Sequence, residues 1–205
     1  FAFRMKTDSE TKLTRNTGFY ERTSKLTRNF VDARGFWLPN DYTKHGIINE
    51  HTACREKAVV IDLSSLRKFE ILGPDAEELM NYTLTRNVKK LSVGQVVYSS
   101  MCYENGTMFD DGTLLKLSDH GFRWVCGDEY AGQWLKDQAK KKNYKVLIKD
   151  STDQINNISL QGPNSRKILE KIIFTPPTQP SISELQWFRF TICRLEELNG
   201  IPLMV

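Results

Sequence analysis

Cysteine and histidine are scarce in this sequence, and neither is clustered. The 205 residues include four cysteines, with no Cys-x-x-Cys pair, and three histidines, none at the spacing of zinc ligands. A metal site or a Cys-His nucleophile therefore has little support. Scattered cysteines of this kind are typical of reduced thiols in an intracellular protein.

Long apolar runs and concentrated charge are also missing. No uncharged apolar stretch approaches the roughly 18 residues that a membrane-spanning helix needs, and Phe1 to Arg15 holds no signal-peptide core. The net charge of +4 is spread along the chain, and its one dense run, Lys140 to Lys142, is typical of the solvated end of a helix. We therefore expect no membrane insertion and no nucleic-acid partner.

After a polar lead-in over residues 1–17, which we expect to be mobile, residues 18–205 have the pattern of a folded domain. The segment "HGIINEHTACREKA" has helical spacing, and "VVIDLS" after it predicts a buried strand.

One motif occurs twice. The segments "KFEILGPDAEELMNYTL" from Lys68 and "NISLQGPNSRKILEKII" from Asn157 each predict a strand, a Gly-Pro turn and an amphipathic helix. Gly73 and Gly162 occupy matched positions, and Asp75 is the expected cap of the first helix. The repeat predicts an α+β fold of two related sheet-plus-helix lobes.

Between the two copies, the pattern predicts strands over residues 95–103, 108–117 and 122–126, then a helix over 129–141 and the strand "YKVLIKD". Beyond the proline-rich "TPPTQP", we expect strands around a hairpin at Asn199-Gly200. The chain stops at Val205 within an apolar strand, so we expect the domain to continue past it.

Two adjacent carboxylates stand out in "MFDDGTLLKL". Asp-Asp-Gly is ordinary turn chemistry, and on that ground alone a turn is favoured. If the stretch is extended, Asp110 and Asp111 point to opposite faces, and whichever faces inward needs a partner.

Taken in order, these segments resemble the folate-dependent aminomethyltransferase family, that is, the T-protein of the glycine cleavage system and the related tetrahydrofolate-dependent demethylases. The matching segments are "GFWLPNDY", "AVVIDLSSLRKFEILGPDA", "GQVVYSSMCYENGTMFDDGTLLKL", "FRWVCG" and "ISLQGPNSRKIL". The resemblance covers roughly residues 17–205. It implies tetrahydrofolate as cofactor and a three-lobed folate-binding fold, of which this chain supplies the first part without the C-terminal β-barrel domain.

The resemblance also implies roles for particular residues. Asp111 falls at the family's principal catalytic position, where a partly desolvated carboxylate contacts the pterin and stabilises cationic charge. Tyr98 and Leu66 fall at positions that contact the folate rings. Thr113 and Leu115 share a strand face with Asp111 and complete the expected cofactor-binding set. For Tyr98, Leu66 and Leu115, plain core packing is the alternative.

The remaining polar positions have lesser roles. We expect Asp110 to face solvent in a turn-like role. Gly127 and Asp128 stand where the family often has Asn-Ala, and the family's "Arg-x-Gly-Tyr-Thr-Gly-Glu" segment would begin beyond Val205.

The implied activity is transfer of a one-carbon unit to tetrahydrofolate. The donor is an aminomethyl-lipoyl carrier protein, as in T-protein, or a small methylated compound such as dimethylglycine, sarcosine or a sulfonium; we favour aminomethyl transfer as the commonest role. A non-enzymatic folate-binding regulator is a further alternative. The expected partners are the donor and the C-terminal part of the same polypeptide, in the cytoplasm, or the mitochondrial matrix of a eukaryote.

Overall fold

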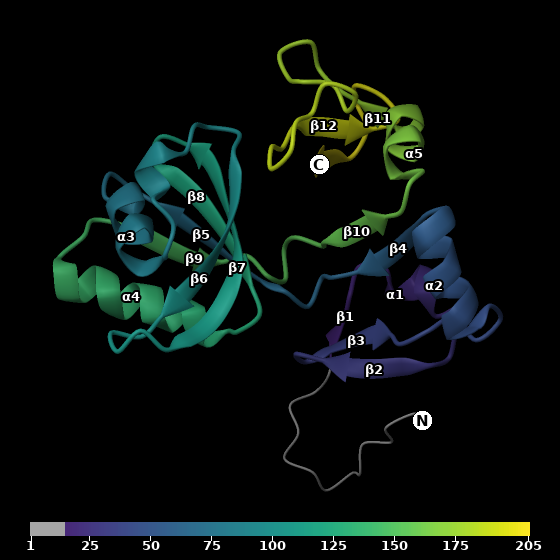
Figure 1. Ribbon diagram of the computed structural model, residues 1–205, viewed down its shortest axis with the longest axis horizontal. Coiled ribbons are helices and arrows are strands. Elements are labelled where there is room, and N and C mark those ends of the chain that lie inside the picture. Colours follow the sequence, from purple (N-terminus) through teal and green to yellow (C-terminus); the bar gives the residue numbers. More distant parts are fainter. Residues whose placement is uncertain (1–14) are drawn as a thin grey trace, which may run out of the picture. The chain divides into compact units, whose positions relative to one another are not determined.

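The computed structural model describes residues 15–205, which form two compact units (Figure 1). One unit extends up to Ser65 and includes residues 155–168, and the other comprises 66–154 and 169–205. The predicted lead-in lies outside the described residues except for its last three, of which Arg15 and Asn16 form a short strand. No helix among the described residues has both the length and the apolar character needed to span a bilayer.

The first unit contains two small sheets. Strands β1 (Arg15–Asn16), β3 (Phe36–Pro39) and β2 (Phe30–Ala33) form one, in that order. Strands β4 (Val59–Asp62) and β10 (Ile158–Gln161) form an antiparallel pair. The helices are α1 (Tyr20–Thr23), α2 (Gly46–Glu56) and the start of α5 (Ser165–Ile172). The predicted helix over "HGIINEHTACREKA" is thereby confirmed. A strand does form within "VVIDLS", but the prediction that it is buried is wrong, since Val60 is 54% and Ile61 44% exposed.

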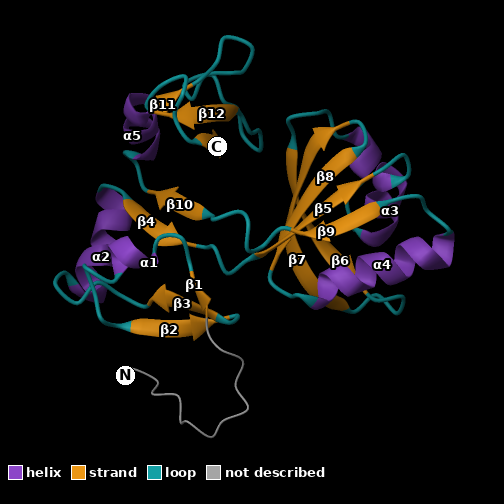
Figure 2. Cartoon of the chain, turned by 180° about the vertical axis from the view of Figure 1, so that it is seen from behind, coloured by secondary structure: helices purple, strands orange, loops and turns teal. Residues whose placement is uncertain are grey.

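The second unit is built on a five-stranded antiparallel sheet in the order β6-β7-β8-β5-β9. Its strands are β5 (Arg67–Leu72), β6 (Val96–Cys102), β7 (Met108–Ser118), β8 (Gly121–Cys126) and β9 (Leu147–Asp150). Helices α3 (Ala76–Thr83) and α4 (Tyr130–Lys142) cover one face, and a 3-10 turn spans Val88–Lys90 (Figure 2).

The core of this unit lies between that sheet face and the two helices. Trp124, Phe122 and Leu114 from the strands meet Leu79 of α3 and Leu135 of α4, and all five side chains are fully buried. The apolar stripes of both helices hold them against the sheet. Asp75 makes no side-chain cap; instead its carboxylate accepts the Lys145 N–H at 2.7 Å, so the predicted capping role is wrong.

A smaller sheet completes the second unit. Strands β11 (Ile173–Phe174), β12 (Ile192–Leu195) and β13 (Pro202–Met204) pair antiparallel in that order. The last two form a hairpin whose connection includes Asn199 and Gly200, as the sequence predicts.

The repeated Gly-Pro motif has the same geometry in both copies. Gly73 and Gly162 have φ of 136° and 131°, a region that favours glycine. A Cβ at Gly73 would lie 2.4 Å from the Lys145 carbonyl oxygen, and one at Gly162 would lie 2.5 Å from that of Lys57. Each glycine thus lets its turn pack against a residue just before the neighbouring antiparallel strand, Lys145 before β9 and Lys57 before β4. The prediction of two related α+β lobes is confirmed.

The Asp-Asp-Gly segment is not a turn. Strand β7 is continuous from Met108 to Ser118 and pairs with β6 on one side and β8 on the other. Two flanking hydrogen-bond ladders override the local turn preference of three residues. Asp110 and Asp111 therefore point to opposite faces of the sheet.

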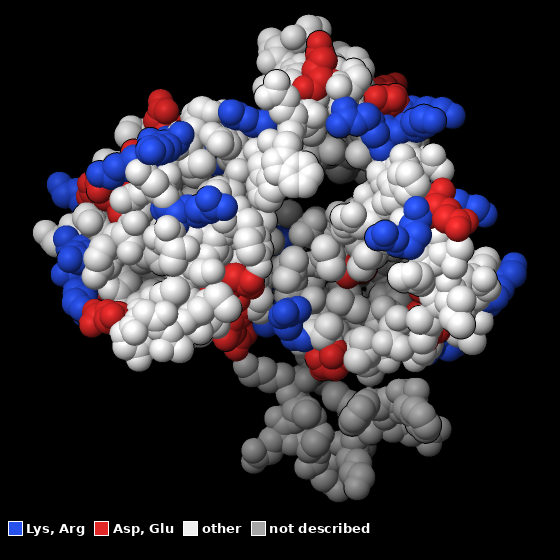
Figure 3. All heavy atoms as spheres, in the orientation of Figure 1, with Lys and Arg blue, Asp and Glu red and all other residues white. Residues whose placement is uncertain are grey.

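Charged side chains are mixed over the surface. Figure 3 shows Lys and Arg interspersed with Asp and Glu over the visible face. All four cysteines are free.

Candidate functional site

The sheet face opposite α3 and α4 gathers the sequence-predicted site residues, and we call it the outer face. Its side chains alternate with the buried ones that form the core. Its members are Val96, Tyr98 and Ser100 of β6; Asp111, Thr113 and Leu115 of β7; Arg123 and Val125 of β8; and Lys68 and Glu70 of β5. The register fixes which of them are neighbours, since Tyr98 lies opposite Thr113 and Ser100 lies opposite Asp111.

Tyr98 and Asp111 are joined directly. The Tyr98 hydroxyl donates a hydrogen bond to Oδ2 of Asp111. Within the described residues it is the only hydrogen-bond partner of that carboxylate. The hydrogen bond to the Asp111 carboxylate is the main cause that raises the pKa of Tyr98 above its usual value. Desolvation and the negative charges of Asp111 and Asp110 raise it further. Tyr98 therefore remains a hydrogen-bond donor across the neutral pH range.

The other predicted residues differ in their distance from this pair. Thr113 and Leu115 are half-buried on the same face of β7 as Asp111. Leu66 directly precedes β5, which lies two places from β7 in the strand order, about 10 Å away at the usual strand spacing. Its carbonyl accepts a hydrogen bond from Nζ of Lys68 at 2.7 Å. The fold thus groups Tyr98, Asp111, Thr113 and Leu115, with Leu66 at the margin.

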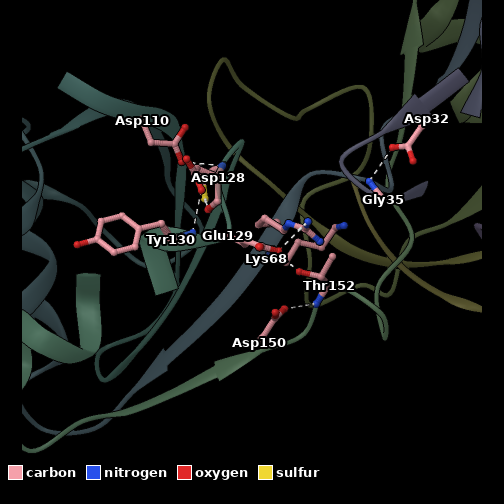
Figure 4. Close-up of polar contacts among 11 residues, drawn as sticks. Asp32, Gly35, Lys68, Asp110, Asp128, Glu129, Tyr130, Asp150 and Thr152 are labelled. Atoms are coloured by element: carbon pink, nitrogen blue, oxygen red, sulfur yellow. Dashed lines mark hydrogen bonds and ion pairs between the residues drawn. The ribbon is translucent and has the colours of Figure 1, made fainter. Parts of the chain in front are cut away.

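Asp110 is buried, so the expectation that it faces solvent is wrong. The residue is 9% exposed because the even-numbered positions of β7 from Asp110 to Lys116 point into the core. The carboxylate accepts the backbone N–H of Gly127 at 3.3 Å and of Asp128 at 3.1 Å. Asp128 in turn accepts the Tyr130 N–H at 2.9 Å, at the first residue of α4 (Figure 4). Asp110 therefore fastens β7 to the turn between β8 and α4.

This arrangement explains what Gly127 and Asp128 contribute: their backbone N–H groups supply the hydrogen bonds that the inward Asp110 carboxylate needs. It also affects Cys126. Burial, together with the negative charge of Asp110, raises the pKa of the Cys126 thiol far above its usual value. Burial and a raised pKa both favour the protonated thiol over the thiolate that a nucleophilic cysteine uses.

Replacing Asp110 by alanine is expected to lower the free energy of unfolding by about 1–3 kcal/mol, the usual cost of leaving buried backbone donors without an acceptor. Urea unfolding of the full-length protein measures the change. Asp119→Ala is the matched control, because Asp119 is exposed in the turn between β7 and β8. Equal unfolding midpoints for the two variants would contradict the fastening role.

Two other charged residues of the outer face, Arg123 and Glu70, form a second, separate pair. Nε of Arg123 lies 2.6 Å from Oε1 of Glu70, with the two side chains 19% and 14% exposed. The Ser151 hydroxyl donates to the same oxygen at 2.9 Å. Sequence reasoning missed this pair, because the strands that bring it together lie far apart in the chain.

An exposed aromatic residue near the outer face was also missed. Trp187 is 88% exposed and lines a hollow of about 320 Å³ with Val96, Phe188 and Arg189. The carbonyl of Phe188 accepts the Val96 N–H at 2.9 Å, and Phe188 has φ of 53°, an unusual value for a bulky residue. The closely spaced aromatics in "QWFRF", five residues after the proline-rich "TPPTQP", were the available signal.

Metal ligands do not gather in the part of the chain that the structure describes: no three His, Cys, Asp or Glu side chains lie close enough to hold an ion. The candidate site is the outer face itself, where the Asp111 carboxylate lies beside the Tyr98 phenol, with Thr113 and Leu115 on the same face of β7.

Two curated proteins are similar in sequence to most or all of this chain. The chain is 50% identical over 204 residues to the trimethylamine-oxide aldolase of Ruegeria pomeroyi, covering 100% of this chain and 26% of that protein. It is 31% identical over 197 residues to an aminomethyltransferase of Symbiobacterium thermophilum, covering 93% of this chain and 50% of the relative.

The fold has a solved counterpart. The glycine cleavage system aminomethyltransferase T of Bartonella henselae superposes with a TM-score of 0.71 at 24% identity, covering 88% of this chain and 50% of that one. The chain thus spans about half the length of its aminomethyltransferase relatives and about a quarter of the aldolase. Residues 19–205 match the family described as the GCVT N-terminal domain, and the chain belongs to that family.

Proposed function

We propose that this chain is the tetrahydrofolate-binding part of an enzyme that moves a one-carbon unit at the oxidation level of formaldehyde, with Asp111 as its catalytic residue. The observation that carries the proposal is the presentation of the Asp111 carboxylate on the outer face, beside Tyr98 and on the same side as Thr113 and Leu115.

The residues present fit a reduced folate. Asp111 offers an acceptor for N–H groups, and the half-exposed Tyr98 offers an aromatic edge or face. Leu115 and Val96 lie opposite one another and supply apolar contact. When bound, tetrahydrofolate supplies the two nitrogens, N5 and N10, that carry the transferred carbon. The protein supplies orientation and a fixed negative charge near the cation that develops as the carbon–nitrogen bond to the donor breaks.

The oxidation level follows from the chemistry of the named relatives. An aldolase that releases an aldehyde from trimethylamine oxide must yield dimethylamine and formaldehyde, because C3H9NO divides into C2H7N and CH2O. An aminomethyl group is formaldehyde condensed with an amine, and so carries carbon at the same level. Either donor is consistent with 5,10-methylene-tetrahydrofolate as product and inconsistent with 5-methyl-tetrahydrofolate.

The choice of donor rests on similarity across the whole chain. Identity of 50% over the full chain favours a methylated amine oxide or a related methylated amine, compared with 31% for the aminomethyltransferase. Aminomethyl transfer from a lipoyl carrier protein is the second candidate, supported by the aminomethyltransferase relatives and by a fold they share.

A donor screen with the full-length protein is expected to produce 5,10-methylene-tetrahydrofolate and dimethylamine in equal amounts from trimethylamine oxide and tetrahydrofolate, with the oxygen leaving as one molecule of water. Mass spectrometry of the folate and chromatography of the amine measure the two products. A reaction only with an aminomethyl-lipoyl carrier protein would select the second candidate. Formation of 5-methyl-tetrahydrofolate would overturn both.

A further inference from the structure

We propose that Tyr98 acts through its hydroxyl as a positioning residue, fixing the Asp111 carboxylate on the outer face. This inference rests on the proposed function, in which Asp111 contacts the folate. The family resemblance implies only a ring contact for Tyr98, whereas the structure shows a hydrogen bond from its phenol to Oδ2 of Asp111.

The pairing of β6 and β7 places the two side chains on one face. Tyr98 lies opposite Thr113, and Ser100 lies opposite Asp111, so Tyr98 is the diagonal neighbour of Asp111. A tyrosine is long enough to cover that diagonal and to end at the carboxylate. A serine or threonine at the same position would not reach it.

The backbone on both sides of this contact is held in place. On the β6 side, Nε of Arg86 donates to the Tyr98 carbonyl at 3.3 Å, and the Arg86 N–H donates to the Ser99 hydroxyl at 3.3 Å. On the β7 side, the neighbouring Asp110 carboxylate binds the N–H groups of Gly127 and Asp128. With both strands fixed, the remaining freedom of the Asp111 carboxylate is rotation of its side chain, and the Tyr98 hydroxyl limits it.

Such restraint matters because catalysis is sensitive to small displacements. A shift of about 1 Å in a reacting group lowers rates by a factor on the order of 100. A carboxylate held at one oxygen has a defined orientation for the other, so the folate meets a preorganised acceptor rather than a rotating one.

Other charged groups surround the pair. Asp110 lies on the opposite face of β7 and Arg86 beside β6, while Lys68, Arg123 and Glu70 share the outer face. Arg123 and Glu70 pair with one another, and Nζ of Lys68 donates to the Leu66 carbonyl. Within the described residues, the direct partner of the Tyr98 hydroxyl is therefore Asp111.

The kinetic test is a double-mutant cycle in the full-length protein. Tyr98→Phe keeps the ring and removes the hydroxyl, and we expect kcat to fall about 10-fold or more while KM for tetrahydrofolate changes by less than about twofold. In an Asp111→Asn background, Tyr98→Phe should cause no further loss, because the group it positions has been changed. Wild-type kcat in Tyr98→Phe, or an equal loss in both backgrounds, would overturn the inference.

A second readout requires no activity. In the folate-free, full-length protein labelled with ¹³C at the tyrosine ζ carbon, the signal assigned by Tyr98→Phe should titrate above the usual tyrosine pKa. Asp111→Asn should lower that pKa towards the usual value, and the control Asp119→Asn should leave it unchanged. An unchanged Tyr98 pKa in Asp111→Asn would overturn the contact.

The two proposals fail separately. If Asp111→Asn turns over at the wild-type rate, the proposed function fails, whatever the tyrosine titration shows. If Asp111→Asn loses turnover while Tyr98→Phe does not, only the positioning role fails.

Discussion

Asp111→Asn in the full-length protein is expected to lower turnover by a factor on the order of 100 or more, with the fold intact. Asparagine keeps the size of the side chain but removes its negative charge, and that charge would stabilise the cation formed during carbon–nitrogen cleavage. The fold should survive because Asp111 lies half-buried on the outer face, and its one hydrogen bond to a side chain is with Tyr98. Steady-state kinetics and the urea unfolding midpoint, measured together, separate the two effects.

Two controls accompany this variant. Asp119→Asn removes an exposed carboxylate from the turn after β7 and should be neutral in both measurements. Asp110→Asn places an amide where two backbone N–H groups need acceptors, so it should reduce stability more than turnover. Wild-type turnover in Asp111→Asn, or a larger loss of turnover in Asp110→Asn, would show that catalysis depends on the other face of β7.

Gly112→Ala is expected to lower the free energy of unfolding by about 3 kcal/mol, at the upper end of the usual cost of overpacking. A Cβ at Gly112 would lie 2.2 Å from the Val125 carbonyl oxygen and 3.0 Å from Cζ2 of Trp124. The oxygen belongs to the backbone of β8 and cannot rotate away. To relieve this clash, β7 would have to move away from β8 beside Asp111, so turnover should fall as well. Urea unfolding measures the change in stability, and kcat measures the change in turnover.

Gly106→Ala is the matched control for steric crowding. Gly106 lies in the turn between β6 and β7 at φ of 83°, and a Cβ there would meet no atom within 4 Å. The change should cost about 1 kcal/mol, through the left-handed backbone alone. If both variants lose the same stability, the close approach of β7 to β8 does not account for the glycine at position 112.

Local pattern was sufficient for most of the secondary structure. The alternation in residues 95–103 and 108–117 predicts β6 and β7 to within two residues at each end, because side-chain periodicity is set by the backbone itself. The repeated Gly-Pro motif predicts two equivalent turns for a similar reason, since a backbone with positive φ and a neighbour within 3 Å admits only glycine.

The pairing of Tyr98 with Asp111 depends on register, which local pattern does not encode. Cys102 lies opposite Met108, and a regular ladder continued from that pair would place Tyr98 opposite Gly112. An irregularity between Met101 and Cys102 shifts the register by one residue, so Tyr98 lies opposite Thr113. A shift of one residue in the pairing changes which side chains of β6 lie on the same sheet face as a given side chain of β7. It therefore decides whether Tyr98 shares a face with Asp111.

The sequence by itself determined the α+β class, the repeated motif, the family and the fact that Asp110 and Asp111 diverge if extended. These depend on residue order and on alternation along one strand. The tertiary structure alone decided that Asp110 is the buried member and that Asp111 has Tyr98 as its partner. Those outcomes require the Tyr98 side chain of β6 and the backbone donors of the turn between β8 and α4, which only the completed sheet brings together.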